Sequence, residues 1–297
     1  MKLTIKLCVF ILISINVFAS NVQVQELVAI SLEEKSMPAD IILSHAESNT
    51  FGIYDAKSGS INFYNINGRL INSISKPYLG GGNCFVEYGD KYLYCNNKDK
   101  SLDIIDKNLN VFQKVVLPKN IKGKFDPTDV IVLGNSLYIV DNDNHRILKY
   151  SFESKQFEII GKFGENNGEF WYPYSIALDS SKTLFVSETL GTRIQKIRPD
   201  NSFGGVIGGW GINPGQFYRP TGIALLNDNL LFVADGYLGH IQLIDSSGKF
   251  AGVLMDSKNR PLKLGSITHI RIKDNFLGVI DAWNKKVYIY KILGSLK

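Results

Sequence analysis

The sequence GQFYRPTGIALL, residues 215–226, repeats an earlier segment of the same chain, GEFWYPYSIALD at residues 168–179. Each copy is followed by a second apolar segment that ends in an acid, a polar loop and a third apolar segment: NLLFVADGYLGHIQLID after the later copy and TLFVSETLGTRIQKI after the earlier one. The two copies start 47 residues apart, which leaves room for four short strands. A repeat of about 40 to 50 residues built from short strands is typical of a β-propeller blade.

Four further copies extend this pattern in both directions. One follows Pro127 as VIVLGNSLYIVD, one follows Pro38 as IILSHAESNTFGIYD, and two less regular copies contain FVEYGDKYLYCN and IRIKDNFLGVID. Strands that are apolar on both faces suit sheets that lie between two neighbours. The sequence therefore predicts an all-β fold, a six-bladed β-propeller. Its blades would cover roughly residues 36–79, 80–118, 119–162, 163–208, 209–256 and 257–297.

The predicted ring needs one more strand to close. Five copies have a candidate fourth strand, but the chain ends shortly after VYIYKIL in the last copy. The alternating segment VQVQELVAIS, residues 22–31, precedes the first copy. We expect this N-terminal strand to complete the last blade, which would close the ring and remove the exposed edges of an open row of sheets.

Three central copies also resemble a known family. GQFYRPTGIALLNDNLLFVADGYLGHIQLID and GEFWYPYSIALDSSKTLFVSETLGTRIQKI, with LYIVDNDNHRILKY, are similar to NHL repeats, whose pattern contains Gly-Gln-Phe, Pro-x-Gly-hydrophobic, Val-Ala-Asp and Asn-His-Arg-Ile. The other three copies match this pattern less well. The resemblance implies a six-bladed propeller. It implies no single activity, since NHL-like propellers serve as interaction platforms, sensor domains and, less often, lyases or hydrolases.

The first 19 residues have the features of a secretory signal peptide. Lys2 and Lys6 precede an apolar run over residues 7–18, and Ala19 offers a small residue for cleavage. The run is shorter than the roughly 20 apolar residues that span a bilayer, and an uncleaved anchor is the alternative. We therefore expect a secreted or periplasmic propeller over residues 20–297 that does not span a membrane. The formal net charge of +5, lower still without the two lysines, gives no indication of nucleic-acid binding.

The exported chain would hold two cysteines, Cys84 and Cys95. In an oxidising compartment an even number of cysteines favours a disulfide. The segment CFVEYGDKYLYC predicts a hairpin with Gly89-Asp90 at the turn, which sets the two cysteines directly opposite each other as a hydrogen-bonded pair. Such a bridge would contribute roughly 3 kcal/mol in the chain-entropy model. Two buried free thiols are the alternative.

A polar residue ends the second strand of every copy. These residues, which we call the acid column, are Asp55, Asn96, Asp141, Glu188, Asp235 and Asp281. A ring of carboxylates is compatible with a cation site, but the same residue type in every blade indicates a local role. Asp and Asn side chains commonly accept hydrogen bonds from nearby backbone N–H groups, and we expect the acid column to bind the loop that follows.

A second set of positions lies at the start of each innermost strand and differs between blades. These residues, which we call the inner column, are Asp40, Cys84, Asp129, Ser175, Gly222 and His269. A specific function is expected where a repeated frame varies. Asp40, Asp129 and His269 would approach one mouth of the ring, where two carboxylates and an imidazole could bind Zn²⁺ or Ca²⁺.

Aromatic residues and an arginine precede the first strand of two central copies, at the same mouth. They are Trp171 and Tyr172 in one copy and Tyr218 and Arg219 in the next. Such residues are enriched at binding surfaces and could hold a peptide or a sugar. The alternative is that they merely cover the buried phenylalanines that precede them.

These patterns favour a binding function over catalysis. The sequence contains no glycine-rich phosphate loop between a strand and a helix, no Gly-x-Ser-x-Gly elbow and no His-Glu-x-x-His motif. We predict an exported, non-catalytic module that binds a protein, peptide or carbohydrate and needs no cofactor. The alternative is a metal-dependent propeller enzyme, similar to lactonases or amidating lyases, with a divalent ion at the mouth.

Overall fold

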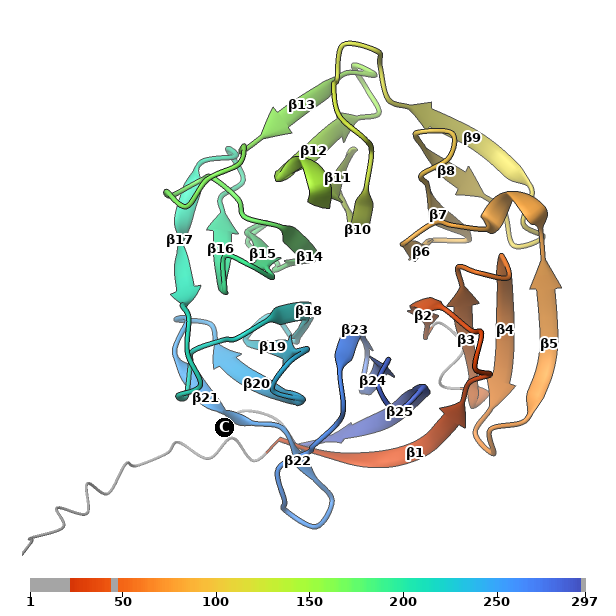
Figure 1. Cartoon of the computed structure of the whole chain (residues 1–297), viewed down its shortest axis with the longest axis vertical. Helices are drawn as coiled ribbons and strands as arrows, with labels where there is room; N and C mark the ends of the chain where they lie inside the picture. Colours follow the sequence, from red (N-terminus) through yellow and green to blue (C-terminus); the bar gives the residue numbers. More distant parts are fainter. Residues whose placement is uncertain (1–21, 44–47, 295–297) are drawn as a thin grey trace, which may run out of the picture.

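Six antiparallel β-sheets are arranged like blades around a central axis in the computed structural model of the chain (Figure 1). The structure describes residues 22–43 and 48–294. This confirms the predicted fold class. The predicted signal peptide lies outside the described residues, within which no helix is long and apolar enough to cross a membrane.

The first three blades follow one another along the chain, and in each blade the strands run from the axis outward in sequence order. Blade 1 contains β2 (Pro38–Ile42), β3 (Thr50–Asp55), β4 (Ser60–Asn65) and β5 (Leu70–Ser75). Blade 2 contains β6 (Phe85–Tyr88), β7 (Lys91–Asn96), β8 (Ser101–Ile105) and β9 (Val111–Val116). Blade 3 contains β10 (Pro127–Leu133), β11 (Ser136–Asp141), β12 (Arg146–Ser151) and β13 (Phe157–Ile160).

The other three blades complete the circle. Blade 4 contains β14 (Pro173–Leu178), β15 (Leu184–Glu188), β16 (Arg193–Ile197) and β17 (Phe203–Gly208). Blade 5 contains β18 (Pro220–Leu226), β19 (Leu230–Asp235), β20 (His240–Asp245) and β21 (Phe250–Val253). Blade 6 contains β23 (Ile267–Lys273), β24 (Phe276–Asp281), β25 (Lys286–Leu293), β1 (Gln23–Ser31) and β22 (Met255–Asp256). Within the described residues, two short 3-10 helices, Pro77–Leu79 and Asn142–Asn144, lie in the connections.

The N-terminal strand closes the ring as predicted. β1 pairs antiparallel with β25, from Gln23 opposite Leu293 to Ser31 opposite Lys286. Blade 6 is thus built from both ends of the described chain, which holds the circle together through backbone hydrogen bonds (Figure 1).

The outer edge of blade 6 differs from the prediction. The segment that follows β21 was expected to remain in blade 5 up to residue 256, but β22 instead pairs parallel with β1, with Gln23 opposite Met255 and Val24 opposite Asp256. This arrangement covers part of the edge that β1 would otherwise expose.

The apolar core consists of six clusters, one between each pair of neighbouring blades. The cluster between blades 4 and 5, for example, joins Phe185 and Ile194 of blade 4 to Phe217 and Val233 of blade 5. Each sheet is therefore apolar on both faces, which explains why strands such as β19 have no polar side. Burial of this kind is the main favourable contribution to folding.

The hairpin of blade 2 has the predicted register. Tyr88 lies opposite Lys91 across the Gly89-Asp90 turn, and Phe85 lies opposite Tyr94. The structure joins Cys84 and Cys95 by a disulfide, with a Cα–Cα distance of 5.3 Å. The Cys95 N–H donates a hydrogen bond to the Cys84 carbonyl at 3.1 Å, as expected for a hydrogen-bonded pair.

Candidate binding site at the axis

Three residues of the inner column fasten one blade to the next one, among them both carboxylates. The Asp40 carboxylate of β2 accepts a hydrogen bond from the Phe85 N–H of β6 at 3.0 Å. The Asp129 carboxylate of β10 accepts from the Ile176 N–H of β14 at 3.1 Å and from the Ser175 hydroxyl at 2.7 Å. These side chains satisfy backbone donors that a short innermost strand leaves unpaired. Variation in the inner column is thus partly variation in how neighbouring blades are joined.

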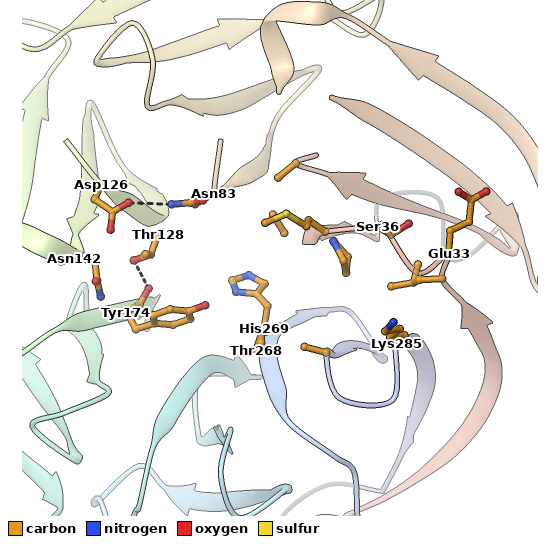
Figure 2. Close-up of a pocket in the computed structure, with 16 residues that line it drawn as sticks. Glu33, Ser36, Asn83, Asp126, Thr128, Asn142, Tyr174, Thr268, His269 and Lys285 are labelled. Atoms are coloured by element: carbon orange, nitrogen blue, oxygen red, sulfur yellow. Dashed lines mark hydrogen bonds between the residues drawn. The ribbon is translucent and has the colours of Figure 1, made fainter. Parts of the chain in front are cut away.

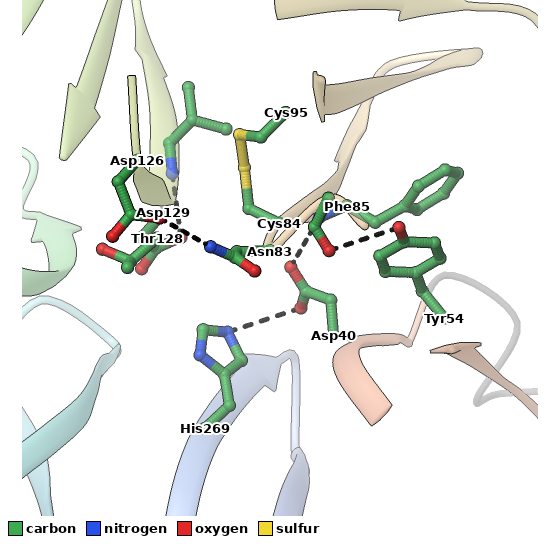
Figure 3. The surroundings of a disulfide bond; sticks show 12 residues. Asp40, Tyr54, Asn83, Cys84, Phe85, Cys95, Asp126, Thr128, Asp129 and His269 are labelled. Carbon is green, nitrogen blue, oxygen red and sulfur yellow. Dashed lines mark hydrogen bonds and ion pairs between the residues drawn. A yellow bond between two sulfur atoms is a disulfide. The ribbon is translucent and has the colours of Figure 1, made fainter. Parts of the chain in front are cut away.

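Among the other positions of the inner column, Ser175 also joins neighbouring blades, whereas Gly222 and Cys84 have different roles. The Ser175 hydroxyl accepts from the Ile223 N–H of blade 5 at 3.3 Å. Gly222 leaves space for the Ile270 N–H of blade 6, which a Cβ atom at that position would approach to 2.7 Å. Cys84 forms the disulfide within its own blade. Figure 3 shows this bridge beside Asp40 and the hydrogen bond to Phe85.

Arg271, which the sequence analysis did not single out, connects the two carboxylates of the inner column. Its Nε lies 2.9 Å from Asp40 Oδ1, and its Nη2 lies 2.9 Å from Asp40 Oδ2 and 2.7 Å from Asp129 Oδ1. Both carboxylates are fully buried. One guanidinium from blade 6 therefore binds blades 1 and 3 together across the axis, in the planar geometry that arginine provides.

The charges of this cluster stabilise one another. Burial opposes ionisation of Asp40, but the positive charge of Arg271 and the contact with His269 outweigh it, and the pKa of Asp40 lies well below its ordinary value. Burial likewise opposes the charge on Arg271, yet Asp129 and Asp40 raise the pKa of Arg271 above its ordinary value. Asp40 and Arg271 are therefore ionised at neutral pH.

The predicted metal ligands Asp40, Asp129 and His269 do meet at the axis, but their arrangement does not fit a divalent cation. Arg271 donates to both carboxylates, and the remaining oxygen positions accept backbone N–H groups. Within the described residues, no group of three His, Cys, Asp or Glu side chains is placed to hold a metal ion. The donor set fits a guanidinium.

A cavity of about 500 Å³ opens at the axis on the side of the loops that enter the innermost strands (Figure 2). We call it the axial cavity. One part of its lining is apolar and comes from Leu32, Met37, Pro38, Ala39, Ala56 and Ala282. The polar part comes from Glu33, Ser36, Asn83, Asp126, Thr128, Asn142, Tyr174, Thr268, His269 and Lys285. Blades 1, 2, 3, 4 and 6 all contribute.

His269 is the most unusual polar group of the axial cavity. Only 4% of its surface is exposed, and its Nε2 has no hydrogen-bond partner among the described residues. The nearest carboxylate oxygen, Asp40 Oδ1, lies 3.4 Å away and is already bound by Arg271. His269 therefore lines the axial cavity with Nε2 turned toward Asp40, and the protein uses little of the hydrogen-bonding capacity of this imidazole.

Other polar groups of the axial cavity differ in how far the protein satisfies them. The Asn83 amide donates to Asp126 at 3.1 Å, and the Thr128 hydroxyl donates to the Tyr174 carbonyl at 2.7 Å (Figure 2). The hydroxyls of Tyr174 and Thr268 make no hydrogen bond within the described part of the chain. Burial raises the pKa of Tyr174, although Arg219 opposes this, so its hydroxyl stays a donor at neutral pH.

The acid column has the structural role that was predicted, and it reaches further than predicted. Asp235 accepts the N–H groups of Tyr237 and Leu238 in the following loop, and also those of Tyr218 and Arg219 in the loop that enters its blade. Asp55 and Asp281 bind two loops in the same way. These three acids thus hold the two loops of their blades together at the face that carries the axial cavity, whereas Glu188 binds only the entering loop, through the Trp171 N–H, and Asn96 only the following loop, through the Asp99 N–H.

The structure does not bring the four predicted ligand-binding residues into one site. Tyr172 packs edge-on against His145, with ring centroids 4.5 Å apart, and Tyr218 stacks on Tyr237 at 4.1 Å. Arg219 is exposed, and Trp171 lines a separate hollow over blade 4. None of the four lines the axial cavity, whose aromatic residue is Tyr174.

Two residues of the site were missed because the sequence analysis considered one position in each innermost strand. Side chains two residues apart in a strand point to the same face. Arg271 follows His269 by two residues in β23, and this spacing predicts that both face the axis. Tyr174 precedes the inner column by one residue, so its place in the axial cavity depends on how the loop enters β14, which no sequence pattern reveals.

By sequence, the chain matches no established protein family and no curated protein. By structure, it resembles a catalytically inactive histidine variant of virginiamycin B lyase from Staphylococcus aureus with quinupristin, at a TM-score of 0.64 and 16% identity over 92% of this chain and 100% of that one.

Two further neighbours have different functions. A gluconolactonase from Xanthomonas campestris aligns at a TM-score of 0.62 and 13% identity over 93% of this chain and 87% of that one. An auxiliary nutrient binding protein from Bacteroides thetaiotaomicron aligns at a TM-score of 0.64 and 9% identity. This alignment covers 92% of this chain and 76% of that one. Likeness at such low identity establishes the six-bladed propeller fold, and it covers enzymes and a binding protein alike.

Proposed function

We propose that the protein is a non-catalytic binding protein that takes an uncharged polar ligand, a sugar or a peptide segment, into the axial cavity. The observation that carries this proposal is the buried imidazole of His269, which lines the cavity and whose Nε2 makes no regular hydrogen bond within the described residues, lying 3.4 Å from Asp40 Oδ1. The hydroxyls of Tyr174 and Thr268 offer further hydrogen bonds, and the wall around Met37 offers apolar contact. Polar groups that converge on a hollow with an apolar wall are typical of small-ligand sites.

The charges around the axial cavity support a neutral ligand. Arg271 and backbone N–H groups already donate to the oxygens of Asp40 and Asp129, so these carboxylates offer no free position to a cation in the cavity. Burial, reinforced by the charge of Asp143, raises the pKa of Asp126, the carboxyl group that lies beside Asn83. A charged ligand would lose its hydration on entering this partly apolar cavity, which costs free energy unless the charge is paired there.

Export of the protein remains part of this proposal. It is supported by the basic and apolar N-terminal residues and by the disulfide between Cys84 and Cys95, which is the kind of bond that persists in an oxidising compartment. The similarity of blades 3 to 5 to NHL repeats supports an interaction module in the same way, without naming its ligand.

Binding of a defined panel tests the proposal. We expect neutral oligosaccharides or blocked dipeptides to shift the NMR signals of His269. Tyr174→Phe should lower the affinity for the bound compound about three- to tenfold, as expected for the loss of one hydrogen bond. Tyr218→Phe is the matched control, because Tyr218 lies outside the axial cavity. Equal affinity of the Tyr174→Phe variant would reject the site, and no binding by either class would reject the ligand type.

An enzyme is the second candidate, and the same imidazole favours it. A buried histidine that faces a cavity can transfer a proton to or from a bound substrate. The resemblance to a gluconolactonase gives a substrate class to try, namely lactones. Turnover of a lactone that disappears in His269→Ala, and survives in His240→Ala, would replace the binding proposal by this one.

A further inference from the structure

A second hollow, separate from the axial cavity, lies over blade 4. It measures about 370 Å³, and its lining consists of Glu165, Trp171, Leu190, Gly191, Thr192, Arg193 and Trp210. Glu165 and Trp171 belong to the loop between β13 and β14, Leu190 belongs to the turn between β15 and β16, and Trp210 belongs to the loop between β17 and β18. We call this the tryptophan hollow. It shares no residue with the axial cavity.

Large apolar side chains surround the tryptophan hollow and remain open to solvent. Trp210 is 72% exposed and Leu190 is 50% exposed. Phe163, which is 60% exposed, lies against Trp171 with ring centroids 6.5 Å apart. This apolar surface extends beyond the hollow itself, so a small ion or sugar would leave most of it uncovered. Exposed apolar surface of this kind is typical of sites that bind proteins.

The tryptophan hollow also carries one negative charge that the described residues do not balance. Arg193 binds Glu188 at 2.7 Å, and Lys162 binds Glu169 at 3.2 Å, so these charges form pairs. The Glu165 carboxylate is exposed and forms no hydrogen bond or ion pair within the described residues. A carboxylate beside two indole rings attracts a cation, because the faces of the rings are electronegative as well.

Blade 5 shows what the same position looks like when it is closed. At the corresponding positions, 47 residues later, Ile212 replaces Glu165, Tyr218 replaces Trp171 and Tyr237 replaces Leu190. The two tyrosine rings stack at 4.1 Å and occupy each other's exposed faces. The fold therefore does not require an open hollow with a carboxylate at this position, and blade 4 has both.

We propose that the tryptophan hollow is a docking site for a lysine or arginine side chain of a partner protein. The cation would contact Trp171 and Trp210 and pair with Glu165, and apolar residues next to it in the partner would cover Leu190 and Phe163. Arginine and lysine carry long apolar stems, so one side chain can satisfy both the carboxylate and the rings. The proposal is independent of the ligand of the axial cavity.

A pair of model peptides tests this docking site in the whole protein. The probe is a blocked Gly-Leu-Lys-Leu-Gly peptide, and its counterpart carries acetyl-lysine, which has the same stem without the charge. The chain has three tryptophans, so their indole N–H signals in an NMR titration report on the site directly. We expect the lysine peptide to shift the signals of Trp171 and Trp210 and to leave that of Trp283 unchanged, although Trp283 is 80% exposed.

Charge variants complete the experiment. Glu165→Gln keeps the shape of the side chain and is expected to lower the affinity for the lysine peptide about two- to fivefold, with no effect on the affinity for the acetylated peptide. Glu153→Gln, which removes an exposed carboxylate from the turn between β12 and β13, is the matched control and should have no effect. Equal binding of the two peptides, or unchanged affinity in Glu165→Gln, would overturn the proposal. Stronger shifts with an N-acetylglucosamine oligomer, insensitive to Glu165→Gln, would make the hollow a sugar site instead.

Discussion

The repeated phrase of the sequence is explained by contacts that recur residue by residue in blades 4 and 5. Gln195 Oε1 accepts the Gly168 N–H at 2.9 Å, and Gln242 Oε1 accepts the Gly215 N–H at the same distance. Gly161 has a φ of 79°, and a Cβ atom there would lie 2.4 Å from the buried Phe170 ring. The recurring Gly, Phe and Gln residues are therefore explained by packing and hydrogen bonds within the blades, and they carry little information about the ligand.

Arg271 is the residue whose loss should damage the axis most. In Arg271→Met the carboxylates of Asp40 and Asp129 would remain buried without their counter-ion, which costs about 3–5 kcal/mol of unfolding free energy. Denaturant unfolding measures this loss. The unfolding free energy of Arg271→Lys should lie between those of Arg271→Met and the unchanged protein, because lysine keeps the charge but cannot bind both carboxylates in one plane. A stability of Arg271→Met within about 1 kcal/mol of the unchanged protein would contradict this account of the axis.

The pH dependence of the same residues gives a second test. Because the pKa of Asp40 is lowered in the folded protein, its contribution to stability is fully present above its unfolded pKa of about 3.9 and is lost as the pH falls through the folded value. The unchanged protein should therefore lose stability below about pH 4. Arg271→Met lacks this contribution, so the difference between the two proteins should shrink on acidification. A difference that stays constant from pH 7 to pH 3 would be inconsistent with an ionised cluster.

At the scale of elements, the disulfide hairpin of blade 2 shows how much the chain gains from a covalent link. Cys84 and Cys95 are 11 residues apart and fully buried, and they lie beside the hydrogen bond between Asp40 and Phe85 (Figure 3). Replacing both cysteines by alanine should lower the unfolding free energy by roughly 3 kcal/mol, chiefly by freeing the unfolded chain. The measurement is the denaturation midpoint of both proteins with and without reductant. If reductant destabilised the double variant as much as the unchanged protein, the disulfide would not be the cause.

Strands were easier to predict from the sequence than the residues of the site, for physical reasons. A hairpin such as β6–β7 depends on a local turn and on alternating side chains, so Gly89-Asp90 is enough to set its register. β22 could not be foreseen, because two residues that leave one sheet for the next carry no pattern of their own. Asp40 and Arg271 are 231 residues apart, and only the closed circle brings them within hydrogen-bond distance.

At the scale of the whole molecule, one face of the ring collects the features that could bind other molecules. The acid column holds the loops on this face, the axial cavity opens there, and the loops of blade 4 form the tryptophan hollow on it. The repeat fixes the number of blades and therefore the shape of this face, while repeat positions whose residue differs between blades, such as those of His269 and Glu165, give it its chemistry. Fold and function are thus encoded at different positions of the same repeat.

The closure of the ring depends on pairing and not on chain order, and this can be tested by moving β1. Gln23 lies opposite Leu293 in the β1–β25 ladder, so the end of β25 is next to the start of β1. A circular permutant that places residues 22–31 after residue 293, joined by a tight Asn-Gly turn, should form a continuous β25–β1 hairpin. We expect the permutant to be monomeric and to have an unfolding free energy within about 1–2 kcal/mol of that of the unchanged protein. Deletion of residues 22–31 is the matched comparison.

The deletion should behave very differently from the permutant, because it removes apolar residues from both interfaces of blade 6. Val24 is part of the cluster between blades 5 and 6, and Ile30 is part of the cluster between blades 6 and 1. Without β1, the backbone of β25 would also become an open sheet edge, which favours association with other chains. Light scattering after refolding should detect aggregates of the deleted chain and none of the permutant. If the deleted chain were soluble and folded cooperatively, the ring would close without β1. The N-terminal strand would then not be required for the fold.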